Sequence, residues 1–128
     1  MALRNHCIIF LLLLACCGCG GGRVVSAPLE FDLTQWNFGG VDSQGGSVFH
    51  SFRITNTSQE DFVIGSLATN CSCVHAYIGR IKILAGESVE MEVSINPSGA
   101  YGEKEYFVIL HDKDENPVRK FTLKLEIY

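Results

Sequence analysis

The sequence lacks the features that mark nucleic-acid-binding proteins and proteins of several domains. It has 10 Lys and Arg against 14 Asp and Glu, which gives a formal net charge of −4 over 128 residues. It has no basic stripe interleaved with aromatic side chains, so we expect no nucleic-acid partner. Apart from a glycine-rich stretch near the N-terminus it has no low-complexity tract and no internal repeat, and its length suits one compact domain.

Motifs for common catalytic chemistry are absent as well. The sequence contains no Gly-x-Ser-x-Gly elbow, no His-Glu-x-x-His pair and no phosphate-binding glycine loop. The exposed carboxylates of Glu90 and Glu92 fit the solvated face of a strand better than an acid/base pair. We therefore expect a protein that is not an enzyme.

The apolar run at the N-terminus is too short to cross a membrane. It covers residues 7–15, whereas a spanning helix needs roughly 20 apolar residues. A short head with Arg4 precedes it, and Leu13, Leu14, Ala15 and Cys16 end it. This layout is that of a secretory signal, and the terminal cysteine resembles the lipobox of bacterial lipoproteins. The resemblance implies a signal peptide over residues 1–15 and acyl chains, such as palmitate, attached at Cys16.

Two alternatives to modification of Cys16 remain open. Ordinary cleavage could follow Val25, Ser26 and Ala27, although Pro28 is a poor residue just after a cut. Cys17 could be the acylated residue instead of Cys16. The residue before it would then be a cysteine, whereas the residue before Cys16 is Ala15. We favour Cys16, with no cofactor other than this covalent lipid. Residues 16–28 then form a flexible glycine-rich tether with a typical reach of roughly 20 Å.

The rest of the chain, residues 29–128, alternates apolar and polar residues with a period of two. The clearest run has Val89, Met91, Val93 and Ile95 on one face. No segment keeps a helical period over the roughly 10–12 residues that a helix would need. The spacing predicts an all-β, antiparallel two-sheet sandwich of immunoglobulin-like type with about seven strands. The expected strands include residues 48–55, 62–67, 70–78, 88–95, 103–111 and 121–127.

Three aromatic side chains are candidates for special positions. Trp36 and Phe38 lie near the first strand, and we expect them to fill the core, with an exposed Trp36 as the alternative. His50 falls on the core face of its strand, where a hydrogen-bonded buried histidine is expected.

Several short motifs together resemble a bacterial family known as the domain of unknown function number fifteen-seventy-three. They occur in the family's order and are residues 37–40 (NFGG), 54–57 (ITNT), 70–73 (NCSC), 85–87 (AGE) and 96–99 (NPSG). The resemblance covers roughly residues 31–128 and implies a Hydin-like immunoglobulin sandwich, usually exported and often lipidated. The family's cysteine pair is typically Cys-Gly-Cys-Thr, whereas this chain has Ser72 between its cysteines and Val74 after them. The resemblance supplies no substrate and no catalytic residue.

Cys71, Cys73 and His75 form the one cluster with ligand or redox chemistry. On a straight strand their side chains would share a face, with neighbours about 6.6 Å apart. A disulfide needs Cβ atoms about 3.8 Å apart, and a zinc site needs its thiolates within about 4 Å of each other. A bend at Ser72 could satisfy either requirement. A structural or reduced pair, a local disulfide, a soft-metal site and redox exchange therefore all stay open, and a metal is not favoured.

These observations predict a non-enzymatic binding or scaffolding module, anchored through lipid to a membrane of the bacterial cell envelope. Such a module would present an edge strand or a loop end to an envelope protein or a glycan. The alternative is a periplasmic protein that handles metal or thiols through Cys71 and Cys73.

Overall fold

The computed structural model describes residues 29–128, and these form nine strands without a helix. The predicted signal peptide, the lipidation site Cys16 and the tether lie outside the described residues. Within the described part there is consequently no helix long and apolar enough to cross a membrane. The strands are β1 (Leu29–Phe31), β2 (Gln35–Val41), β3 (Val48–Asn56), β4 (Phe62–Thr69), β5 (Val74–Ile78), β6 (Lys82–Ile83), β7 (Ser88–Ile95), β8 (Gly102–Asp112) and β9 (Pro117–Ile127).

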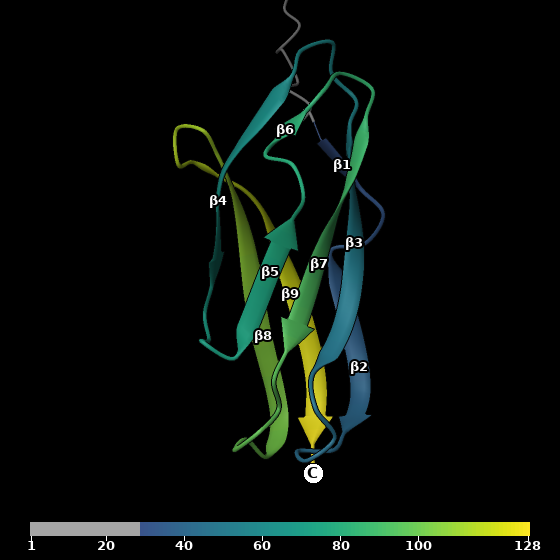
Figure 1. Ribbon diagram of the computed structural model, residues 1–128, viewed down its shortest axis with the longest axis vertical. Helices are drawn as coiled ribbons and strands as arrows, with labels where there is room; N and C mark the ends of the chain where they lie inside the picture. The colour runs from purple at the N-terminus through teal and green to yellow at the C-terminus, as the bar shows by residue number, and fades with distance from the viewer. Residues whose placement is uncertain (1–28) are drawn as a thin grey trace, which may run out of the picture.

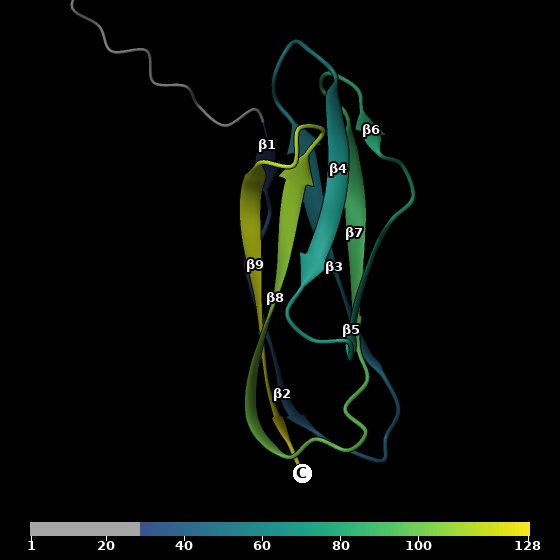
Figure 2. The ribbon, with the colours of Figure 1, turned by 90° about the vertical axis from the view of Figure 1, so that its left-hand side faces the viewer.

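The strands form two sheets packed face to face, which confirms the predicted sandwich (Figure 1). One sheet has four strands in the order β1-β3-β7-β5, and the other has five in the order β2-β9-β8-β4-β6. The chain therefore changes sheet at every connection between consecutive strands except the one from β8 to β9. The view along the flank in Figure 2 shows the two layers and the loop that carries the chain from β4 to β5.

The structure differs from the sequence prediction in three respects. β2 pairs with β9 in parallel, whereas the sandwich was expected to be antiparallel throughout. Residues 29–128 form nine strands rather than about seven, since β1 and β6, of three and two residues, are too short to show a period. The strand expected over residues 70–78 begins only at Val74.

The core lies between the sheets and is built by alternate residues of the long central strands. Each strand turns every second side chain inward, so the period of two places the apolar set against the opposite sheet. Phe121 of β9 packs against Phe52 of β3, with ring centroids 5.0 Å apart. The fully buried apolar side chains of the strands are Phe52, Ile54, Ile83, Met91, Val93, Ile95, Val108, Leu110, Phe121 and Leu123.

One polar side chain, that of Asn56, is also completely buried, at the end of β3. Its Nδ2 donates to the carbonyl oxygens of Glu60 (2.7 Å) and Ile83 (2.9 Å). Its Oδ1 accepts from the backbone N–H and the hydroxyl of Ser58, at 3.0 and 2.7 Å. A buried amide is tolerated only when its donors and acceptors are paired in this way.

The backbone of Asn56 joins the same network. Its N–H donates to Glu87 O and its carbonyl accepts from Gly86 N–H, both at 2.8 Å. Because β3 belongs to the four-stranded sheet and Ile83 to the five-stranded one, this single residue connects the two layers at one end of the sandwich.

We expect Asn56→Ala to lower the free energy of unfolding by about 3 kcal/mol, because it leaves the buried carbonyl of Ile83, the carbonyl of Glu60 and the N–H of Ser58 without their partner. Asn96→Ala is the matched control. Asn96 makes a similar contact to the N–H two residues ahead, at 3.0 Å, but it is exposed, so its loss should cost under about 1 kcal/mol. Urea unfolding of the full chain measures both, and equal losses would contradict this role of Asn56.

Candidate functional site

The cysteines expected to carry chemistry lie in the turn that joins β4 to β5. Cys71 and Cys73 are bonded to each other in a disulfide, with Cα atoms 5.1 Å apart. Of the four interpretations left open by the sequence, the structure thus shows the local disulfide. Residues 71–73 form a turn and not an extended strand, so the spacing that argued against a bridge does not apply to them. The chain turns at Ser72, which is the bend that a bridge between its two neighbours requires.

The disulfide adds little to the stability of the fold through chain entropy. Its two cysteines are separated by only two positions, so the closed loop is very short. Loop-closure entropy predicts a gain of about 1.6 kcal/mol for three residues, against about 3 kcal/mol for a 15-residue loop. The sulfurs could bind a metal only after reduction, since thiolates are the ligands.

His75, the third residue of the predicted cluster, lies on β5, exposed on the outer face of the four-stranded sheet. The cysteines instead pack against the margin of the core. Within residues 29–128, no group of three His, Cys, Asp or Glu side chains is placed to hold a metal ion. The structure therefore brings the two cysteines together and leaves His75 apart from them.

β5 follows the disulfide directly and is an edge strand of the four-stranded sheet. Asn96 N–H donates to Cys73 O at 2.9 Å, which marks these two residues as a hydrogen-bonded pair of the β5–β7 ladder. Because such pairs alternate along antiparallel strands, His75 and Tyr77 also bond to β7. The N–H and C=O groups of Ala76 and Ile78 consequently point away from the sheet.

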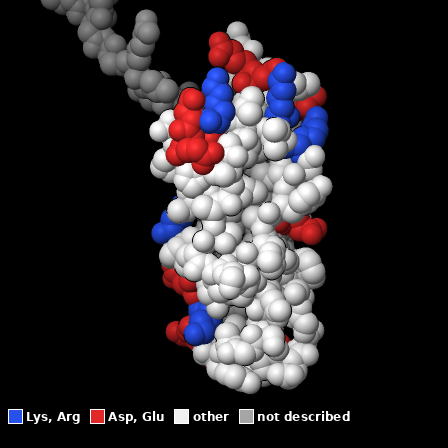
Figure 3. Space-filling view, turned by 60° about the vertical axis from the view of Figure 1, so that its left-hand side comes forward, with Lys and Arg blue, Asp and Glu red and all other residues white. Residues whose placement is uncertain are grey.

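The flank around this edge carries little charge. Neither β4 (FVIGSLAT) nor β5 (VHAYI) contains Lys, Arg, Asp or Glu. Figure 3 shows a broad uncharged surface on this side of the molecule, with the charged side chains gathered mainly at one end. Natural edge strands are commonly protected by charges, prolines or bulges. β2, an edge strand of the five-stranded sheet, has such a bulge between Asn37 and Gly40, whereas the register of β5 with β7 is unbroken.

Trp36 and His50 stack on each other where β2 approaches β3. Their ring centroids lie 3.9 Å apart with an interplanar angle of 11°. Trp36 is 37% exposed, so it does not fill the core as expected; Phe38 packs partly against the core. The buried Nε2 of His50 has no hydrogen-bond partner among the described residues, contrary to expectation. Burial lowers the pKa of His50, and the carboxylate of Asp32 opposes this in part.

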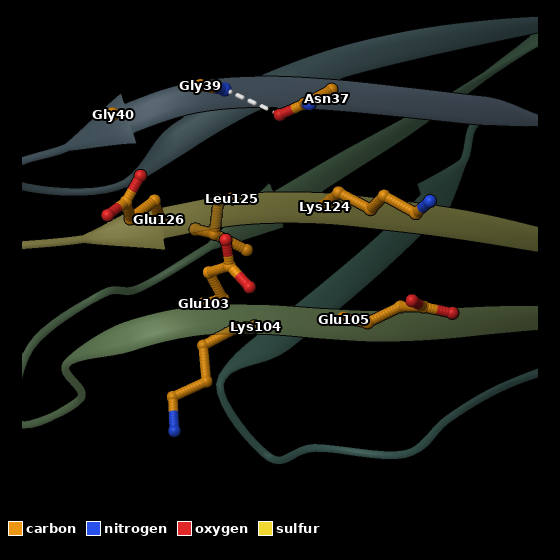
Figure 4. Close-up of a pocket in the computed structure, with 9 residues that line it drawn as sticks. All are labelled: Asn37, Gly39, Gly40, Glu103, Lys104, Glu105, Lys124, Leu125 and Glu126. Carbon is orange, nitrogen blue, oxygen red and sulfur yellow. Dashed lines mark hydrogen bonds between the residues drawn. The ribbon is translucent and has the colours of Figure 1, made fainter.

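A hollow of about 370 Å³ lies on the outer face of the five-stranded sheet, across β2, β9 and β8 (Figure 4). Glu103 lies opposite Glu126 in the ladder, and Glu105 lies opposite Lys124. The three glutamates that line the hollow are exposed, as charged side chains on the outer face of a sheet usually are. Asn37 Oδ1 accepts from Gly39 N–H at 2.8 Å and holds the bulge that forms one wall. The geometry offers no buried polar group that would orient a ligand.

Sequence reasoning identified the cysteines but missed the backbone groups of β5. Period-two alternation predicts which side chains face the core, but it does not predict strand order, so it cannot show which strand is an edge. The absence of charge from both β4 and β5 was the one available signal.

Residues 29–127 match the family described as "Protein of unknown function (DUF1573)". Among curated proteins, none matches this sequence.

Solved structures share the fold. A protein of unknown function from Porphyromonas gingivalis W83 superposes with a TM-score of 0.65 and 18% identity, covering 80% of this chain and 50% of that one. The VesB protease of Vibrio cholerae superposes with a TM-score of 0.58 and 18% identity, covering 77% of this chain and 32% of that one. A FixG-related protein from Vibrio parahaemolyticus superposes with a TM-score of 0.51 and 16% identity, covering 80% of this chain and 98% of that one. The chain thus spans half or less of the first two structures, and at these identities the likeness shows the fold alone.

Proposed function

This chain belongs to the DUF1573 family of proteins of unknown function, and we propose that it is a non-enzymatic binding module of the bacterial cell envelope. In this proposal the protein is exported, acylated at Cys16 and held at a membrane, and the sandwich binds an extended segment of an envelope protein. The observation that carries the binding role is the open edge of β5.

The edge of β5 suits the addition of a strand. Ala76 and Ile78 offer backbone donors and acceptors about 6.6 Å apart, the repeat with which an antiparallel partner strand would bond. Main-chain hydrogen bonds would supply affinity, and side chains on either face would supply specificity. The part-buried side chains of Leu67, Ala76 and Ile78 would form the inner wall for apolar residues of the partner.

The outer face beside the edge supports the same role. Tyr77 lies on β5 and is 69% exposed, and Phe49 lies across β7 on β3 and is 62% exposed. Large exposed aromatic side chains are enriched in interfaces between proteins because they bury much area with little loss of entropy. An added strand at β5 would place its outward side chains next to Tyr77.

The lipid anchor rests on the sequence from Leu13 to Cys16. A single acyl chain binds a membrane only marginally, whereas two or more chains hold a protein firmly. The first strand begins at Leu29, so a dozen residues would separate the anchor from the sandwich. A flexible segment of that length would keep the β5 edge close to the membrane surface while letting it turn toward a partner.

We expect a photo-crosslinking residue in place of Tyr77 to give a discrete adduct with an envelope protein in living cells. The same residue in place of Tyr101, which is 64% exposed and lies outside β5, between β7 and β8, should give none. Adding Ala76→Pro should reduce the Tyr77 adduct at least tenfold, because proline removes an edge donor without breaking a bond to β7. Gel electrophoresis and mass spectrometry of the adducts measure the outcome.

An adduct that survives Ala76→Pro, or equal adducts from the two positions, would contradict binding at this edge. Proteolytic stability of the Ala76→Pro chain should match that of the wild type, which separates loss of binding from loss of the fold.

For the anchor, mass spectrometry of the mature N-terminus should find an acylated Cys16 in the full chain made by its native bacterium. Cys17→Ser should leave that modification unchanged, whereas Cys16→Ser should abolish it and leave residues 1–15 attached. An unmodified N-terminus at Pro28 or nearby would refute the anchor and leave the binding edge untouched.

A further inference from the structure

The turn that holds Cys71 and Cys73 is built so that its disulfide can open without loss of the fold. Cys71 O accepts from Thr69 Oγ1 and from Val74 N–H, both at 3.1 Å. Cys73 O accepts from Asn96 N–H at 2.9 Å. These bonds hold the backbone on both sides of Ser72, and none of them needs the bond between the sulfurs.

A further bond ties the turn to the opposite sheet. Asn70 Oδ1 accepts from the backbone N–H of Phe107 on β8 at 2.8 Å. The two cysteines are therefore fixed by the four-stranded sheet through Asn96 and by the five-stranded sheet through Phe107. After reduction the thiols would stay side by side, ready to close again.

The two sulfurs are not equivalent. Cys73 N–H donates to Cys71 Sγ at 3.1 Å, so a backbone dipole points at one sulfur of the pair. A hydrogen bond to a thiolate stabilises the charged form, and a stabilised thiolate is the better leaving group in exchange. Both cysteines are partly exposed and Ser72 is exposed, so the turn that carries the disulfide lies at the surface.

We propose that Cys71 and Cys73 form a reversible thiol–disulfide exchange site whose substrate is a dithiol of another protein. A partner thiolate attacks Cys73 Sγ and forms a mixed disulfide with it. The bond between Cys71 and Cys73 breaks, and its electron pair goes to Cys71 Sγ, where the N–H of residue 73 stabilises the thiolate. This inference does not depend on strand binding at β5.

The second thiol of the partner completes the exchange. Once deprotonated, it attacks the partner's own sulfur in the mixed disulfide, closes a disulfide within the partner and releases Cys73 as a thiolate. The partner has then lost two electrons and two protons, and Cys71 and Cys73 have gained them. The reverse sequence oxidises this chain again.

Dithiothreitol, a small dithiol, tests the exchange on the full chain. After quenching with N-ethylmaleimide, trypsin releases residues 54–80, a peptide that contains Cys71 and Cys73 and no other cysteine. We expect the pair to pass fully from disulfide to dithiol and to return with oxidised glutathione, while amide exchange in the core strands stays slow. Reduction that proceeds only as fast as global unfolding would overturn the proposal.

A matched pair of variants tests the asymmetry. Cys73→Ser leaves the Cys71 thiol with the N–H of residue 73 beside it, whereas Cys71→Ser leaves the Cys73 thiol without that donor. At pH 6 we expect iodoacetamide to modify Cys71 about threefold faster than Cys73, since a larger thiolate fraction outweighs a lower nucleophilicity. If either variant fails to fold, the wild-type chain can be reduced and partly alkylated instead. Fragment ions in its mass spectrum then give the ratio of modification at Cys71 to modification at Cys73. Equal rates, or faster reaction at Cys73, would overturn the assigned leaving group.

Discussion

The buried side chain of Asn56 is the constraint on which the arrangement of this sandwich depends. Its amide bonds to the backbone at Glu60 and Ile83 and to Ser58, and its own backbone bonds to the turn before β7. A buried amide must find all its partners, so the two sheets can meet at this end in only one register. Apolar contacts elsewhere in the core favour burial but are much less directional.

With one end fixed by Asn56, the two flanks of the sandwich differ. At β2 a bulge interrupts the edge, and a stacked Trp36 and His50 cover the gap between the sheets. At β5 the edge is regular, uncharged and preceded by a turn held from both sheets. Binding at β5 and exchange at Cys71 and Cys73 are thus separate proposals that use neighbouring parts of one flank.

Much of the fold could be predicted because long strands such as β7 show their buried face directly as Val89, Met91, Val93 and Ile95. The parallel pairing of β2 and the short strand β6 could not, since they depend on contacts distant in sequence. The cysteines were recognisable as a site, but their bond required the turn at Ser72, which alternation does not reveal. The unpaired backbone N–H and C=O groups of Ala76 and Ile78 could not be predicted, because they depend on strand order and side-chain patterns do not indicate strand order.

The most direct test of this account is residue-resolved amide hydrogen exchange in β5, because the open edge determines which backbone groups face outward. We predict rapid exchange at Ala76 and Ile78 and slow exchange at His75 and Tyr77, which bond to β7. Slow exchange at all four amides would mean that another segment covers this edge. The inverse pattern would mean that the register with β7 is shifted by one residue, and either result would contradict the account.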